Sequence, residues 1–257
     1  NKQIELSFDI LPSSEFTSLI IKHFNLPLSG KVEGSYNVRG DLNKKNFRIL
    51  TFSNLKDAKI DLNLLNWSKP IGDESTLSAI IDFKKGKVTK LEAIEFNADD
   101  FAANGRLSFN QIGGINSGYF EDIKFSDNDI KKIIISKTKE NILKYTVEGK
   151  SLNLVSIRKN QGFTQGKELL FDITAEKITI GPKITFSGNL IGKTQKNGNG
   201  KATLQGSLLS SSEPLMTEAS INALFGSSGE YLDGVGLIGG GEAKLSYRPI
   251  TKNKNFL

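Results

Sequence analysis

The feature that most constrains the fold of this chain is an alternation of apolar and polar residues with a period of two, repeated between short polar turns. It is clearest over residues 55–83, LKDAKIDLNLLNWSKPIGDESTLSAIIDF. Successive side chains of a β-strand point to opposite faces, so each half of this stretch predicts a strand with one apolar and one wet face. Pro70 and Gly72 predict a turn that joins the two strands into a pair.

The same unit of strand and polar turn recurs almost to the end of the chain. Only 37% of the residues are hydrophobic, and 25 glycines interrupt the pattern, which disfavours long helices. The sequence therefore predicts a mainly β protein with one or two short helices, near residues 13–25 and 218–225. In the second helix Ile221, Leu224 and Phe225 would share a face.

The length of 257 residues is compatible with one large β domain or with two smaller ones. The stretch 159–166 is polar and low in hydrophobic residues, and it is the best candidate for a boundary. We therefore expect one β segment over 1–158 and a continuation over 159–257.

Charge and composition exclude several kinds of site. The net charge is +6, but no aromatic-rich basic stripe concentrates it, so we expect no nucleic-acid partner. The excess either favours anionic surfaces such as lipid headgroups or is an ordinary solvated face. The chain has no cysteine and a single histidine, His23, which removes thiolate and multi-histidine metal sites. We expect no metal and no cofactor.

No catalytic motif stands in a suitable context. Residues 234–239, GVGLIG, match the dinucleotide-binding pattern, but that chemistry needs a following helix, and here Gly240, Gly241 and a predicted strand follow. Residues 188–194 resemble a phosphate loop that is one residue short. An enzyme that uses Glu95, Asp99 and Asp100 is a third hypothesis, but acids at a strand end are typical of solvated turns. We expect no enzymatic activity.

Four stretches carry a resemblance to a known family. They are LKDAKIDLNLLNWSKPIGDES at 55–75, FAANGRLSF at 101–109, YTVEGKSLNL at 145–154, and residues 221–247. Together they resemble the AsmA-like proteins of the bacterial envelope, and within them the YhdP-type group. The first stretch looks like that group's strand followed by a Trp-x-Lys-Pro-x-Gly turn. Asn153 stands where the family usually has Asp.

The resemblance implies a long, curved, antiparallel sheet that forms an open apolar groove, β-taco-like in shape. It also implies a periplasmic location, an inner-membrane anchor upstream of this sequence, and transport of phospholipid between the inner and outer membranes. The expected partners are phospholipid acyl chains, the inner membrane, and outer-membrane or other envelope proteins. The expected lining residues are Ile60, Leu62, Leu64, Leu77, Ala79, Ile81, Phe83, Phe186, Leu204 and Leu208.

The alternation itself is compatible with a second architecture. Strands with one apolar face can stay open and offer that face to a ligand, or they can close on one another around a filled core. The alternative function is therefore a structural or adhesive β-sandwich or solenoid module that carries no lipid.

Overall fold

The protein is described here by a computed structural model. It describes residues 3–10, 28–41, 43–62, 65, 67–155, 168–181, 184–197, 199–210, 213–226 and 229–247. The helix predicted near 13–25, with His23, lies outside these residues. No helix in the described ranges has the length and apolar character that a membrane span requires.

The described chain is mainly β, as predicted, and forms two compact units. Unit 1 is Asn1–Lys137 and unit 2 is Thr138–Leu257. The strands of unit 1 are β1 (Gln3–Ile10), β2 (Leu28–Gly30), β3 (Glu33–Asp41), β4 (Asn46–Asn54), β5 (Ala58–Leu62), β6 (Trp67–Lys69), β7 (Ser75–Lys84), β8 (Lys87–Ala98), β9 (Phe101–Phe109), β10 (Ile115–Phe125) and β11 (Asn128–Lys137). Those of unit 2 are β12 (Leu143–Asn153), β13 (Leu169–Gly181), β14 (Ile184–Thr194), β15 (Gly200–Ser210), β16 (Glu213–Gly226), β17 (Gly229–Ile238) and β18 (Gly241–Tyr247).

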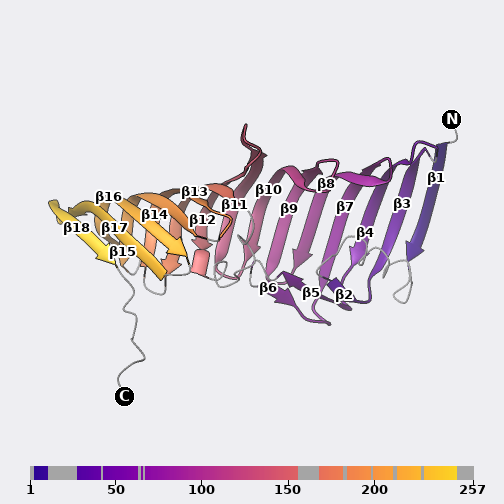
Figure 1. Ribbon diagram of the computed structural model, residues 1–257. Coiled ribbons are helices and arrows are strands. Elements are labelled where there is room, and N and C mark those ends of the chain that lie inside the picture. Colours follow the sequence, from indigo (N-terminus) through magenta and orange to yellow (C-terminus); the bar gives the residue numbers. More distant parts are fainter. Residues whose placement is uncertain are drawn as a thin grey trace, which may run out of the picture. The chain divides into compact units, whose positions relative to one another are not determined.

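Within each unit the long strands form a sheet in which neighbouring strands are hydrogen-bonded. In unit 1 the order is β1-β3-β4-β7-β8-β9-β10-β11, and these strands lie side by side in Figure 1. In unit 2 the strands follow one another from β12 to β18. The boundary predicted at 158/159 falls in a stretch outside the described residues and stays a prediction.

A separate 3-stranded sheet consists of β2, β5 and β6. This corrects the pair predicted over 55–83: β5 pairs with β2 and β6, whereas β7 pairs with β4 and β8. Trp67 and Lys69, expected in the turn, form β6. The prediction failed because alternation identifies a strand without identifying the strand that pairs with it.

In unit 2 one pair departs from the expected antiparallel sheet. β12 and β13 are parallel, from Leu143↔Leu169 to Asn153↔Thr179. Parallel neighbours need a connection of about a dozen residues or more to return the chain to the same edge, and the segment 154–168 supplies it. The other pairs described in this unit are antiparallel.

The helix predicted over 218–225 is wrong, because these residues belong to strand β16. Ala219, Ile221 and Ala223 are buried on one face, whereas Leu224 is 55% exposed on the other. Residues three apart, such as Ile221 and Leu224, share a face in a helix and lie on opposite faces in a strand. The spacing alone therefore does not distinguish the two structures. A bulge at Glu218 (φ 49) adds a further break in the alternation.

Candidate functional site

One face of the large sheet in unit 1 is apolar. Residues directly opposite each other on paired strands share a face, and β4 and β7 pair Phe47 with Phe83 and Ile49 with Ile81. The face continues across β8 and β9, where Ile81 lies opposite Leu91 and Leu91 lies opposite Leu107. We call this surface the apolar face; its residues, all half-buried, are Phe47, Ile49, Leu77, Ala79, Ile81, Phe83, Leu91, Leu107 and Phe109.

The 3-stranded sheet covers one end of this face. The ring of Trp67 in β6 lies 4.7 Å from that of Phe101 in β9 and 5.9 Å from that of Phe96 in β8, and Phe101 stacks on Phe125 at 5.3 Å. The four rings are 9% exposed or less. The Trp67 Nε1 donates a hydrogen bond of 2.8 Å to Asp100 Oδ1. These contacts close the apolar face at the end where β8 leads into β9.

Lys69 holds the short sheet in shape. It is 2% exposed, and its Nζ donates hydrogen bonds to the backbone carbonyls of Ala58 and Pro70, both at 2.8 Å, and of Lys56 at 3.3 Å. The Gly72 amide also donates to the Lys56 carbonyl, at 2.8 Å. Thus Trp67, Lys69 and Gly72 of the Trp-x-Lys-Pro-x-Gly stretch stabilise the end closure.

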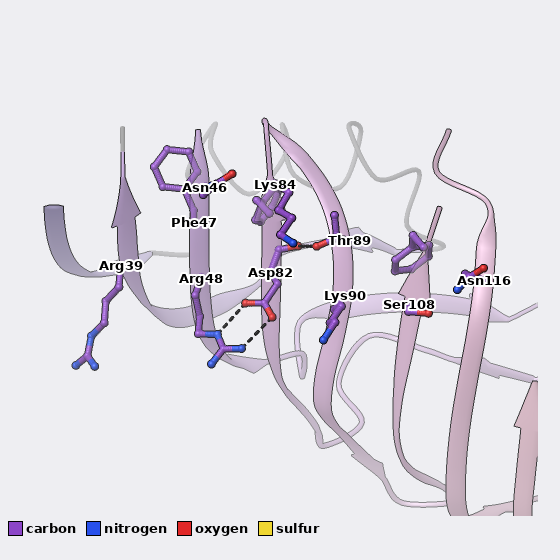
Figure 2. Close-up of a pocket in the computed structure, with 12 residues that line it drawn as sticks. Arg39, Asn46, Phe47, Arg48, Asp82, Lys84, Thr89, Lys90, Ser108 and Asn116 are labelled. Carbon is purple, nitrogen blue, oxygen red and sulfur yellow. Dashed lines mark hydrogen bonds and ion pairs between the residues drawn. The ribbon is translucent and has the colours of Figure 1, made fainter. Parts of the chain in front are cut away.

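The opposite face of unit 1 carries ion pairs that run across neighbouring strands. Arg48 in β4 donates to Asp82 in β7 through two bonds of 2.7 and 2.9 Å (Figure 2). The Arg48 side chain also reaches Glu92 in β8 at 3.1 Å. The hydrogen bonds from Arg48 lower the pKa of the Asp82 carboxyl. Arg39 pairs with Glu5 at 2.7 Å. This face therefore carries charge at the strand ends near Arg48, while Leu50 and Phe52, farther along β4 on the same face, are 42% and 53% exposed.

A hollow of about 570 Å³ lies at the strand ends farther from the short sheet. The cations in its lining, Arg39, Arg48, Lys84 and Lys90, outnumber its one acid, Asp82. The rest of the lining comes from the same strand ends (Figure 2) and comprises Asn46, Phe47, Phe83, Thr89, Ser108, Phe109 and Asn116. Pockets of a few hundred Å³ that combine apolar surface with a few polar groups are typical of small-ligand sites.

The predicted lining residues fall into three groups. Leu77, Ala79, Ile81 and Phe83 all lie on the apolar face and are brought together with β4. Ile60, 6% exposed, and Leu62, half-buried, lie in β5 of the 3-stranded sheet, opposite Lys69 and Trp67 respectively, so they are not part of that face. Leu64 lies outside the described residues.

The lining residues predicted in unit 2 form a filled core. Phe186, Leu204 and Leu208 share one face of the sheet but are 0%, 1% and 9% exposed, so the described structure leaves little of them for a ligand. Between their rows runs a row of small residues, Ala175↔Gly188↔Gly206↔Ala219. A Cβ at Gly206 would overlap the Ser187 carbonyl oxygen, so the strands approach closely here.

Three motifs weighed in the sequence lie in ordinary strands and turns. Residues 234–239 run from β17 into a hairpin turn followed by β18, and 188–194 lie within β14. Asp100 accepts the hydrogen bond from Trp67. Within the described ranges, no group of three or more His, Cys, Asp or Glu side chains is arranged to hold a metal ion.

Five members of the apolar face were missed by the sequence analysis: Phe47, Ile49, Leu91, Leu107 and Phe109. A bulge at Ala93 (φ 47) shifts the register between Leu91 and Ile94, so residues three apart share a face. Strand alternation at 47–52 and 101–109 was visible in the sequence and is the signal that could have found the others.

Comparisons of the sequence with protein-family models, with curated proteins and with solved structures find no match.

Proposed function

We propose that this chain is a lipid-binding segment that holds phospholipid acyl chains on the apolar face of unit 1, as part of a protein that carries phospholipid across the bacterial periplasm. The observation that carries the proposal is the half-exposed state of that face, from Phe47 on β4 to Phe109 on β9. The resemblance to the AsmA-like proteins contributes the transport role, the periplasm, and an inner-membrane anchor outside this sequence.

The chemistry of the two faces suits an amphiphile. An acyl chain laid on apolar side chains gains about 25 cal/mol for each Å² removed from water, without directional contacts. Binding of this kind needs no catalytic group and no tight pocket. The opposite face, with Arg48, Asp82 and Glu92 paired across strands, remains in water. A lipid laid on the opposite face would have to remove these ion pairs from water, so we expect it on the apolar face.

A second function, a structural β module, is favoured by unit 2. Its inner side chains, such as Phe186 at 0% and Leu204 at 1% exposure, are packed as in a protein core. If unit 1 bound no lipid, the whole chain would be best described as a rigid spacer or an adhesive module.

Neighbouring isoleucines of β7 provide a sharp test. Ile80 and Ile81 are both half-buried, but successive strand residues face opposite sides, so only Ile81 lies on the apolar face. A photo-reactive phenylalanine analogue replaces each in turn, and the purified chain is incubated with phospholipid vesicles, irradiated and analysed by mass spectrometry. We expect lipid adducts from position 81 and few from position 80. Equal yields at the two positions, or none at 81, would contradict lipid binding on the apolar face.

A further inference from the structure

The two ends of the strands in unit 1 carry opposite charge. The β3–β4 and β7–β8 turns lie at one end, and their exposed basic residues, which we call the basic rim, are Lys44, Lys45, Lys84, Lys85 and Lys87. The connections at the other end carry exposed acids, the acidic rim: Asp57, Asp73, Glu74, Asp99, Asp100 and Asp127. Lys56, which pairs with Glu74, and Lys31 lie at the same end, and the six acids outnumber them. In an antiparallel sheet, every second turn lies at the same end of the strands. The lysines therefore gather at one end of the strands and the acids at the other.

The basic rim is a built surface rather than a set of scattered lysines. The Gly86 amide donates to the Lys45 carbonyl at 2.9 Å, and the Lys85 amide donates to Asn46 Oδ1 at 3.1 Å, so the two turns are tied together. Lys87 Nζ donates to the Gln111 carbonyl at 3.0 Å, which attaches the next turn. The acids near these turns are Asp41, which lies 3.8 Å from Lys44 Nζ, and Asp82, which Arg48 engages. The rim therefore keeps an excess of positive charge.

The apolar face is also asymmetric along its strands. It ends at the basic rim with the half-buried side chains of Phe47, Phe83 and Phe109. These three also contribute to the hollow, whose charged lining of Arg39, Arg48, Asp82 and Lys90 comes from the opposite face of the same strand ends. At the acidic rim the face is covered by Trp67 and the rest of the 3-stranded sheet. An amphiphile thus has access to apolar surface beside the lysines, whereas the acidic end is closed.

We propose that the basic rim receives the phosphate of an anionic phospholipid whose acyl chains lie on the apolar face. This inference rests on the proposed function and adds the headgroup class and the orientation of the lipid. The positive edge attracts a headgroup with net negative charge, and the acidic edge repels it. A zwitterionic phospholipid with the same acyl chains gains less binding free energy, because the cation of its headgroup is repelled by the lysines. Free phosphate, which has no acyl chain to bury, binds far more weakly than the lipid.

The test compares lipids that differ only in headgroup. The purified chain is incubated with vesicles containing equal amounts of dioleoyl phosphatidylglycerol and dioleoyl phosphatidylcholine, and the bound lipid is quantified by native mass spectrometry. We expect a preference of roughly fivefold or more for phosphatidylglycerol, the factor expected for one additional charge pair about 4 Å apart in water. The preference should shrink when NaCl rises from roughly 0.05 to 0.5 M, because salt screens exposed charges. Inorganic phosphate at millimolar concentration should not displace the lipid.

Two charge-matched variants locate the effect. The rim variant changes Lys45, Lys84, Lys85 and Lys87 to Gln; the control changes Lys31, Lys59, Lys124 and Lys131, which are also exposed, to Gln. The rim variant should bind the two lipids about equally, and the control should keep the preference, with both folded by circular dichroism. No preference in the unmodified chain, or loss of preference in both variants, would overturn the rim inference while leaving lipid binding intact. Dioleoylglycerol, which has the same acyl chains without a phosphate headgroup, tests binding to the apolar face alone. If the chain binds neither phospholipid and does not bind dioleoylglycerol, the proposed function is overturned instead.

Discussion

At the scale of single residues, Lys69 shows how a short motif acts. A lysine that is 2% exposed and faces backbone carbonyls rather than a carboxylate is an unusual core residue. Its three hydrogen bonds gather the carbonyls of Lys56, Ala58 and Pro70 around one ammonium group. The side chain therefore fixes the path of the chain on both sides of β5 and β6, and so positions the neighbouring Trp67.

Lys69→Met should destabilise the protein, because it keeps the aliphatic stem but leaves buried carbonyls without their donor. We expect a loss of about 3 kcal/mol in the free energy of unfolding, typical of losing hydrogen bonds to a charged group in a buried site. Urea unfolding followed by the fluorescence of Trp67, the only tryptophan, measures it. The control Lys59→Met, at an exposed side chain beside Asp61, should change the value by less than about 0.5 kcal/mol. Equal effects would show that Lys69 does not hold the sheet.

At the scale of elements, bulges decide which side chains share a face. Ala93 (φ 47), Asp122 (φ 51) and Glu218 (φ 49) are all non-glycine residues with left-handed backbone, and each lies at a register shift of its strand. The extra residue of a bulge shifts the alternation by one position, so apolar residues three apart in the sequence point to the same face. This is how Leu91 and Ile94, or Met216 and Ala219, come to the same side.

Two alanine variants in β16, one on each face, test whether this segment is a strand. Ile221 is 1% exposed and Leu224 is 55% exposed, so the strand places them on opposite faces, whereas a helix would place them together. Ile221→Ala should lower the free energy of unfolding by about 2–5 kcal/mol, the range for truncating a buried aliphatic side chain. Leu224→Ala should change it by less than about 0.5 kcal/mol. Similar losses in the two variants, measured by denaturant titration, would contradict the strand.

At the scale of the whole molecule, an open sheet has edges. In the described chain β1 is paired only with β3, and Leu6 on β1 is 53% exposed. An edge strand, paired on one side only and carrying an exposed apolar side chain, is a template for pairing with another chain, which natural proteins suppress with charge. The sheet that offers an apolar face to a ligand therefore also carries an association hazard.

Leu6→Lys should reduce self-association, because a charge on the edge strand disfavours edge-to-edge pairing. Sedimentation velocity over a range of protein concentrations should show a smaller fraction of dimers and larger species than in the unmodified chain. Leu50→Lys, on the interior strand β4 and 42% exposed, is the control and should leave the distribution unchanged. The edge explanation fails if Leu50→Lys has the larger effect.

The sequence by itself determined the class of the fold and much of the candidate face. The alternation at 77–83 correctly identified Leu77, Ala79, Ile81 and Phe83 as one side of a strand, because a period of two is a local property of extended backbone. The same rule predicted most of the other strands without any knowledge of their partners.

Only the tertiary structure decided which strands pair, which apolar side chains remain accessible, and where charge collects. β5 belongs to a separate sheet and not to the predicted pair, and Phe186 is buried in the core. Lysines from two different turns lie together at one end of the strands. Pairing, burial and edge charge depend on residues far apart in the chain, and their contact is decided by packing and chain closure rather than by local backbone preference. The alternation is the same for a strand that lines a ligand surface and for one that fills a core.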